Sequence, residues 1–446
     1  MKAALQILFC LSLTTVLKSQ TSWTPQAQGL LPPKTMVFGI SIVNKDVVWA
    51  VADSVFTDSI VPRNHLIKVL KTTNGGTTWR LYKVVEAVGR LSWDIQAIDS
   101  SVAWITGQDY NSGLGRELFK TTDGGTTWVS KFKGVEAGVW IRFFDDQNAI
   151  ILNSSRFART NDGGTVWSTG IISGFKINEG NLFSSSTNSC CVVGDTIWFG
   201  TSQSRIARSV NKGGSWELID LQPLVSSGAR TAFASIAFKD ARNGIAIGWE
   251  NIDSAKLFRT SNGGTTWSKI PNYDYYYGSN IEYIKGTQGS FIVTDPYGFT
   301  SFTTDFGQNW RFVDSLESNV IRFIDTKTGW VGNSVMGMRA PTTNVPTLYK
   351  WNGGNILSAI QTLDADAIAF KISPNPTSRF LAVEYAADFK PTSITIYNVS
   401  GKVVWRQKEA FTPSQVIDLQ SFSDGIYFVQ LQNREGAIAK KVVVQR

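Results

Sequence analysis

The chain has 446 residues, of which 42% are apolar and 17% charged, and it carries a formal net charge of +8. This length exceeds what a single hydrophobic core usually supports, and the composition excludes both a disordered chain and a membrane helix bundle. The positive charge favours an acidic partner, but no arginine-rich arm or cluster indicates nucleic acid. We therefore predict a soluble protein of more than one folding unit that does not bind nucleic acid.

The N-terminal segment has the pattern of a secretory signal peptide. Lys2 precedes an apolar run from Ala4 to Leu17, and a polar stretch with the small residue Ser19 follows. We predict that residues 1–20 are removed and that the mature chain enters the periplasm. No later segment approaches the ~18 apolar residues of a membrane helix, so we expect no transmembrane segment.

A short motif, which we call the box, recurs six times with the pattern Ser/Thr-x-Asp/Asn-x-Gly-x-Thr-Trp. In TTDGGTTW, Asp123 can accept backbone N–H groups within a turn, and Gly125 can take a positive φ. Trp128 then supplies apolar area for packing between neighbouring sheets, which accounts for the many tryptophans. The equivalent residues are Asn74, Gly76 and Trp79; Asp123, Gly125 and Trp128; Asp162, Gly164 and Trp167; Asn211, Gly213 and Trp216; Asn262, Gly264 and Trp267; and Asp305, Gly307 and Trp310.

A second element, a short apolar run, precedes each box and appears seven times, starting at 46, 101, 147, 195, 242, 289 and 328. Repeats of about 40 to 50 residues accommodate the four antiparallel strands of a propeller blade. We predict an all-β fold with a seven-bladed β-propeller over residues 21–357, six blades being the alternative. A degenerate seventh box falls at Tyr349–Asn355, and residues 20–25 should complete the last blade around Trp23.

The boxes resemble Asp-box (BNR) repeats, and together with the second element they look most like propellers of the photosystem II stability and assembly factor type. The resemblance covers residues 21–357 and implies the fold. The same box occurs in sialidases, xyloglucanases and sortilin-type receptors, so it specifies no function.

Residues 371–446 differ in kind and follow a linker predicted at 358–370. Alternating apolar positions broken by Ser400-Gly401 and Asp424-Gly425 predict a small antiparallel β-sandwich. This segment resembles the type A sorting domain of the type IX secretion system in Bacteroidota, an ordinary adhesive sandwich being the alternative. The residues that carry the resemblance are Pro374, Asn375, Pro376, Gly401, Asp424, Gly425, Lys440 and Lys441. The resemblance implies the type IX machinery as a partner and a secreted or outer-membrane surface-attached product.

Catalysis has few candidates in this sequence. The single histidine, His65, lies in a segment that we expect to be a solvated loop. Glycoside hydrolysis needs only two carboxylates, for which Asp94, Asp145, Asp146 and Glu282 are the candidates. The sialidase-type FRIP motif is missing. The most similar segment, Arg205–Arg208, directly precedes a box. Xyloglucanases of this type pair two propellers, whereas this chain has room for one. We therefore predict a binding protein, with a glycosidase as the alternative.

Two features support binding of an extracellular protein or glycan. The residue before the box is basic in five repeats, and five like charges around a ring could steer an acidic ligand. Tyrosines follow the fifth box, and their rigid rings suit sugar stacking and protein interfaces. Solvated strand ends and strand packing are the respective alternatives. The predicted binding residues are Lys71, Lys120, Arg159, Arg208, Arg259, Tyr273, Tyr275, Tyr276 and Tyr277.

Removal of the signal peptide takes Cys10 and leaves two adjacent cysteines, Cys190 and Cys191. They cannot form a disulfide framework or a four-thiolate metal site, and we predict no metal, no cofactor and a monomer. A structural or incidental role is the main interpretation, and a strained vicinal disulfide or redox role is the alternative.

Overall fold

The structure is a computed structural model, and the regular elements of its described part are β-strands and one short 3₁₀ helix, η1 (Val85–Ala87). Within that part, no helix is long and apolar enough to cross a lipid bilayer. The described residues are 23–32, 35–54, 65–109, 115–134, 140–176, 179, 189–221, 224, 232–251, 254–271, 280–295, 299–314, 316–333, 346–352, 370–385, 391–398, 402–408, 411–432 and 437–446. The predicted signal peptide lies outside them.

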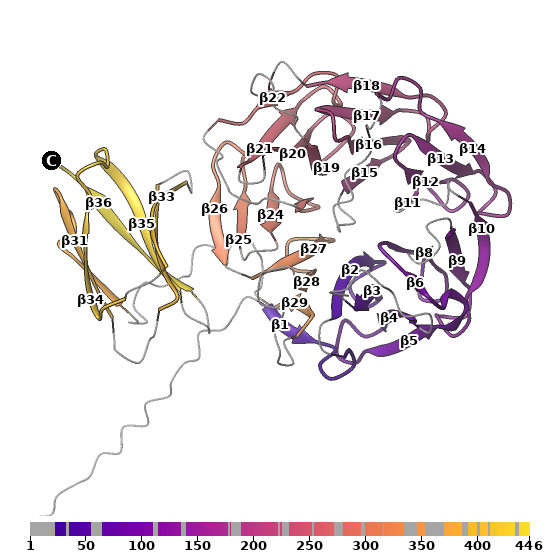
Figure 1. Cartoon of the computed structure of the whole chain (residues 1–446), viewed down its shortest axis with the longest axis horizontal. Helices are drawn as coiled ribbons and strands as arrows, with labels where there is room; N and C mark the ends of the chain where they lie inside the picture. Colours follow the sequence, from indigo (N-terminus) through magenta and orange to yellow (C-terminus); the bar gives the residue numbers. More distant parts are fainter. Residues whose placement is uncertain are drawn as a thin grey trace, which may run out of the picture.

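Seven antiparallel sheets of the described residues stand around a common centre and form a β-propeller (Figure 1). Their innermost strands contact one another in the order β2, β7, β11, β15, β19, β23, β27 and back to β2, which closes the ring. The strands of the seven sheets are β2 (Thr35–Ile42), β3 (Val48–Ser54), β4 (Ile67–Thr72) and β5 (Arg80–Val84); β6 (Arg90–Leu91), β7 (Ile95–Ala97), β8 (Ala103–Asp109), β9 (Gly115–Thr121) and β10 (Val129–Lys133); β11 (Trp140–Phe143), β12 (Ala149–Asn153), β13 (Arg156–Thr160) and β14 (Ser168–Ile171); β15 (Cys190–Val193), β16 (Thr196–Gly200), β17 (Arg205–Ser209) and β18 (Glu217–Asp220); β19 (Ala232–Phe238), β20 (Gly244–Asn251), β21 (Ser254–Thr260) and β22 (Ser268–Lys269); β23 (Asn280–Tyr283), β24 (Phe291–Asp295), β25 (Phe299–Thr303) and β26 (Arg311–Asp314); and β27 (Ser318–Phe323), β28 (Gly329–Asn333), β29 (Leu348–Trp351) and β1 (Trp23–Gln26).

The seven recurrent apolar runs are the second strands of these sheets: β3, β8, β12, β16, β20, β24 and β28. Their residues are buried in succession rather than in alternation; in β12, for example, Ala149 to Leu152 are all buried. A strand inside the ring lies between two neighbouring sheets, so both of its faces bury apolar side chains. This burial explains why the runs are continuous in the sequence.

The ring closes through the N-terminal strand, as the sequence predicts. β1 pairs antiparallel with β29, and Trp23 lies opposite Trp351. Trp23 is 5% exposed, and its ring centroid lies 5.1 Å from that of Trp351. Its indole N–H also donates to Asp314 Oδ2 at 2.7 Å. The last sheet therefore contains strands from both ends of the propeller sequence.

The box forms a turn between the third and fourth strands of a sheet. Asp123 Oδ1 accepts the backbone N–H groups of Thr126 at 3.0 Å and Thr127 at 2.9 Å, and Thr121 Oγ1 accepts the N–H of Gly125 at 2.9 Å. Gly125 has a φ of +95°, and an added Cβ would lie 3.1 Å from the Trp49 ring of the preceding sheet. Conformation and space therefore both require glycine at this position.

Asparagine performs the same function in other boxes. Asn74 Oδ1 accepts the N–H of Thr78 at 2.9 Å, and Asn74 Nδ2 donates to Thr78 Oγ1 at 2.9 Å. The first part of the degenerate seventh box, Tyr349–Asn355, belongs to β29, and residues after 352 lie outside the described part.

The acid sensitivity of the box gives a first prediction. The Thr127 N–H is the main cause that lowers the pKa of Asp123 from 3.8 to about 2. A depressed pKa in the folded state stabilises the fold above pH 3.8, and this contribution is lost as the pH falls towards 2. We expect Asp123→Asn to unfold at nearly the wild-type temperature at neutral pH and to lose less stability over this acid range. Thermal denaturation at a series of pH values checks this, and parallel curves for the two proteins would contradict it.

The C-terminal segment is a β-sandwich of a three-stranded and a four-stranded sheet. Its core contains Leu381, Ile396, Val429 and Val442, each fully buried. The strand order is β30 (Phe370–Ser373), β31 (Phe380–Tyr385) and β34 (Ser414–Asp418) in one sheet, and β33 (Val403–Gln407), β32 (Ser393–Asn398), β35 (Gly425–Gln432) and β36 (Ala437–Val444) in the other. β30 begins at Phe370, which the sequence assigned to the linker, and the other linker residues lie outside the described part.

Predicted sorting-motif residues connect the first strand of this sandwich and the turn after it to the last strand, β36. Asn375 Nδ2 donates to the Lys441 carbonyl at 2.8 Å, and Asn375 Oδ1 accepts the N–H of Val443 at 2.9 Å. The Lys440 ammonium lies 5.6 Å from the Phe370 ring centroid. Gly401 lies outside the described residues.

Candidate functional site

A cavity of about 690 Å³ lies on the propeller axis and is lined by all seven innermost strands. Each innermost strand contributes one residue, which pairs with the same repeat position of the second strand in its sheet. These seven residues therefore form one layer around the axis. The layer consists of Ser41, Gln96, Arg142, Cys191, Ala237, Glu282 and Arg322. Pseudo-equivalent positions thus carry different chemistry, and most of the charge lies on three of the seven sheets.

Asp94 and Arg142 form a buried ion pair in the cavity wall. Arg142 Nη1 lies 2.5 Å from Asp94 Oδ2, and the two side chains are 10% and 1% exposed. Asp94 Oδ2 also accepts the N–H of Ile141 at 2.9 Å, and Oδ1 accepts the N–H of Ile95 at 3.0 Å. Burial raises the pKa of Asp94, and the Arg142 charge opposes this shift. Oδ2 therefore connects the start of β7 to β11, and Oδ1 is engaged within its own strand segment.

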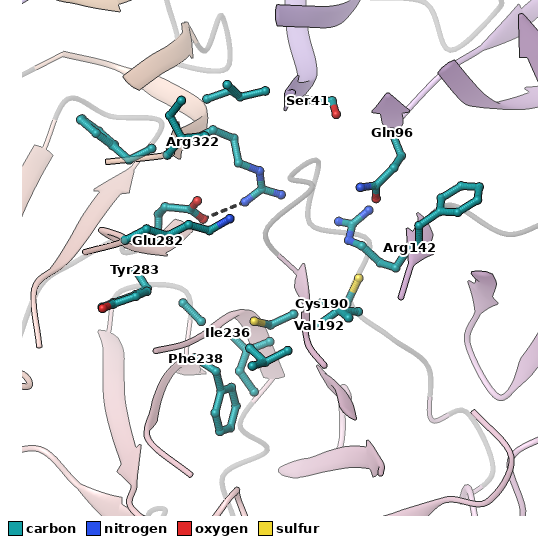
Figure 2. Close-up of a pocket in the computed structure, with 18 of the residues that line it drawn as sticks. Ser41, Gln96, Arg142, Cys190, Val192, Ile236, Phe238, Glu282, Tyr283 and Arg322 are labelled. Atoms are coloured by element: carbon teal, nitrogen blue, oxygen red, sulfur yellow. Dashed lines mark hydrogen bonds and ion pairs between the residues drawn. The ribbon is translucent and has the colours of Figure 1, made fainter. Parts of the chain in front are cut away.

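Glu282 and Arg322 form the second ion pair of the cavity, with Arg322 Nη1 2.9 Å from Glu282 Oε2 (Figure 2). This pair is more open to solvent, because the side chains are 20% exposed for Arg322 and 16% for Glu282. Burial raises the pKa of Glu282, while the positive charges of Arg322 and Lys285 oppose the shift.

The cavity wall carries more basic than acidic side chains. Among the described lining residues, four basic side chains, Arg142, Lys239, Lys285 and Arg322, stand against two acidic ones. A glycosidase needs one carboxyl group as acid and another as base or nucleophile, whereas here each carboxylate is neutralised by an arginine. Guanidinium groups in a partly desolvated cavity bind carboxylate, sulfate or phosphate groups strongly.

The structure brings together two of the four predicted carboxylates and separates the others from them. Asp145 caps its own turn by accepting the N–H of Asn148 at 2.7 Å, and it lies 2.7 Å from Lys212 Nζ. The hydrogen bond from Lys212 is the main cause that lowers the pKa of Asp145. Asp146 is exposed in the same turn. Neither residue lines the cavity.

The prediction for His65 is wrong. Its side chain is buried, and Nε2 contacts Asp53 Oδ1, which is buried as well. Asp53 Oδ2 also accepts the N–H of Ser92 at 3.3 Å, and the His65 carbonyl accepts the N–H of Gly89 at 2.7 Å. The turn-rich sequence around His65 concealed this partner, because Asp53 comes from the preceding strand. Neither His65 nor Asp53 lines the cavity.

Both cysteines are free thiols in the cavity wall. Adjacent residues of a strand direct their side chains to opposite faces, and Cys190 packs in one core cluster while Cys191 contacts another. Burial raises the pKa of Cys190 to about 11 and that of Cys191 to about 12. The described residues contain no group of three or more histidine, cysteine or acidic side chains that could hold a metal ion.

Three of the five predicted basic residues connect neighbouring sheets. Lys71 Nζ donates to the Gly124 carbonyl at 3.1 Å and lies 4.6 Å from the Trp49 ring centroid. Lys120 has the equivalent contacts with the Gly163 carbonyl and Trp104, and Arg208 Nη1 donates to the Gly263 carbonyl at 2.9 Å. Arg159 is exposed and Arg259 half-buried.

Lys350 occupies the equivalent position in the last sheet, where the degenerate box conceals it in the sequence. Lys350 Nζ donates to the Gly75 carbonyl at 2.6 Å and lies 5.4 Å from the Trp330 ring centroid. Each of these cations therefore holds the box of the next sheet along the ring. The signal in the sequence was a basic residue directly before the box in a repeat whose second strand carries a tryptophan.

Lys71→Met tests this connection. The variant keeps the aliphatic stem but loses a charged hydrogen bond and a cation–π contact, so we expect the free energy of unfolding to fall by about 1–2 kcal/mol. Arg159 is exposed and occupies the same repeat position as Lys71. Arg159→Met should therefore change the free energy of unfolding by less than about 0.5 kcal/mol. Chemical denaturation measures both values, and equal effects would contradict the connection between sheets.

The remaining predicted site residues lie elsewhere. Tyr273, Tyr275, Tyr276 and Tyr277 fall outside the described residues. Tyr283, which follows them, lines the cavity and donates its hydroxyl to the Thr287 carbonyl at 2.6 Å. Arg205, in the segment most similar to the FRIP motif, forms an ion pair with the buried Glu179 and does not line the cavity.

Residues 371–445 match the family of secretion system C-terminal sorting domains. This domain marks the protein for type IX export to the cell surface or beyond. None of the curated proteins compared with the chain matches it.

Solved structures of YCF48 share the propeller fold. YCF48 from Cyanidioschyzon merolae is 16% identical with a TM-score of 0.52, covering 74% of this chain and 99% of its own. A structure of YCF48 bound to D1 peptide is 16% identical with a TM-score of 0.50, covering 74% of this chain and 97% of its own. A GH74 enzyme of Niastella koreensis is 13% identical with a TM-score of 0.48, covering 92% of this chain and 66% of its own.

Proposed function

We propose that the protein is an exported binding or scaffold protein that holds an extracellular protein or glycan at the axial cavity of its propeller. The observation that carries this proposal is the pairing of both axial carboxylates with arginines in a cavity with an excess of basic side chains. The sorting domain supplies the export route, and the propeller supplies the binding surface. That a propeller of similar fold, YCF48, was solved bound to D1 peptide supports a peptide as one class of ligand.

A glycosidase is the second candidate, because Asp94 and Glu282 line the same cavity and burial raises the pKa of both. A raised pKa suits a general acid. Against a glycosidase, Asp94 is almost fully buried and accepts the N–H of Ile141 in β11. It therefore lacks the solvent access that a nucleophile or base requires.

The binding proposal is tested with the purified full-length protein on a glycan array and in a pulldown from the surface proteome of the producing cells. We expect reproducible capture of a protein or glycan that binds in the axial cavity. Capture should therefore be reduced in Arg322→Gln. It should be retained in the control Lys131→Gln, which removes an exposed charge from β10. No specific capture by the wild-type protein in either format would overturn the proposal.

A further inference from the structure

We propose that the axial cavity recognises the carboxylate of an acidic peptide segment, with Arg322 as the principal contact and Glu282 as the internal carboxylate with which the ligand competes. This inference rests on the proposed binding function and specifies its ligand.

The position of the two arginines supports an anionic ligand. Figure 2 shows the guanidinium groups of Arg142 and Arg322 directed into the same space from opposite walls, with the Gln96 amide beside Arg142 and the Ser41 side chain facing the same region. A carboxylate at this point would meet two cations and neutral hydrogen-bond donors. Such charge-assisted contacts are stronger and more selective than neutral ones.

The two ion pairs have different accessibility, and this assigns different roles to them. Arg142 is 10% exposed and its partner Asp94 only 1%, whereas Arg322 and Glu282 are 20% and 16% exposed. Displacing Asp94 would leave the N–H of Ile141 without its acceptor. Glu282 also has a hydrogen bond with the backbone of Phe323, but both side chains of this pair reach the solvent of the cavity, so displacing Glu282 from Arg322 costs less than displacing Asp94 from Arg142. Ligand binding at Arg322 therefore leaves the connection between β7 and β11 intact.

The remaining wall favours a peptide over a sugar. Sugars bind to flat aromatic faces, whereas four of the five aromatic side chains of the lining contact another ring. Phe238 stacks on Trp198 with centroids 3.7 Å apart, and Tyr283 and Phe291 have centroids 5.3 Å apart. The lining also contains aliphatic side chains such as Ile42, Val192 and Ile324, which suit the apolar side chains of a peptide.

The test measures binding of a fluorescent tetraglutamate peptide to the full-length protein, with tetraglutamine and an oligogalacturonate as comparison probes. We expect tetraglutamate to bind more tightly than tetraglutamine and to weaken at high salt. Arg322→Gln should lower the affinity about tenfold, the usual loss for one charged hydrogen-bond partner. Glu282→Gln should raise the affinity severalfold, because it removes the competing negative charge and keeps the shape. Lys131→Gln, with the same change in net charge as Arg322→Gln, should have no effect.

The opposite signs of the two cavity variants separate recognition from a structural role. A gain in affinity in Glu282→Gln cannot come from misfolding, whereas losses in both variants would overturn the inference. Equal binding of tetraglutamate and tetraglutamine would also overturn it. Tighter binding of the oligogalacturonate with the same response to the variants would replace the acidic peptide with an acidic glycan. If Arg322→Gln captures the same surface partners as the wild type, the protein still binds a partner but not through Arg322, and this inference fails.

Discussion

Trp23→Ala should lower the free energy of unfolding by about 3–5 kcal/mol, the usual loss for removing a buried tryptophan side chain. Trp23 packs on Trp351 and Phe323, with ring centroids 5.1 and 6.0 Å apart. The variant also takes from Asp314 the indole N–H that it accepts at 2.7 Å. Because β1 is the strand that joins the two ends of the ring, the loss of stability should extend beyond the space that the missing Trp23 side chain leaves.

The control for this variant is Thr24→Ala, which alters an exposed residue of the same strand and should change the free energy of unfolding by less than about 1 kcal/mol. Chemical denaturation followed by tryptophan fluorescence and by circular dichroism measures both proteins. If Trp23→Ala were no less stable than Thr24→Ala, closure of the ring by β1 would not contribute to stability as described.

Asp94→Asn should be the second strongly destabilising substitution, with a loss of about 3–5 kcal/mol, because it leaves the buried Arg142 charge without its partner. Asparagine preserves the shape and can still accept the N–H of Ile141, so the loss reports the ion pair. The measurement is the free energy of unfolding at neutral pH.

Two variants sharpen this prediction. Asp94→Asn combined with Arg142→Gln removes both charges and should recover part of the loss, since no unpaired charge is then buried. Glu282→Gln breaks the more exposed pair and should lower stability by only about 1 kcal/mol. A stable Asp94→Asn protein would contradict the structural role of Asp94 and make it available for catalysis.

Much of the fold could be predicted from the sequence because its signals are local. The box joins Asp123, Gly125 and Trp128 within one turn, and the buried second strands are continuous apolar runs. The strand around Trp23 could be assigned because its sequence matches the end of a box that is otherwise missing. The sandwich was recognisable from alternating apolar positions and its turn residues.

The axial site could be predicted only in part. Asp94 and Glu282 were identified as acidic candidates, but Arg142 and Arg322 were not, because their partners lie far away in the sequence: Arg142 pairs with a residue 48 positions earlier and Arg322 with one 40 positions earlier. The buried contact between His65 and Asp53 was missed for a similar reason. Once strands are aligned by register, the seven inner positions could be compared directly, and this alignment needs the fold.

In the proposed function, the propeller binds its ligand without turning it over. The most direct measurement is release of reducing sugar from every glycan that the protein captures, comparing the wild-type protein with Glu282→Gln. We predict no release above the background of buffer alone for either protein from any captured glycan. Release by the wild-type protein that disappears in Glu282→Gln would contradict the binding function and make the axial carboxylates those of a glycosidase.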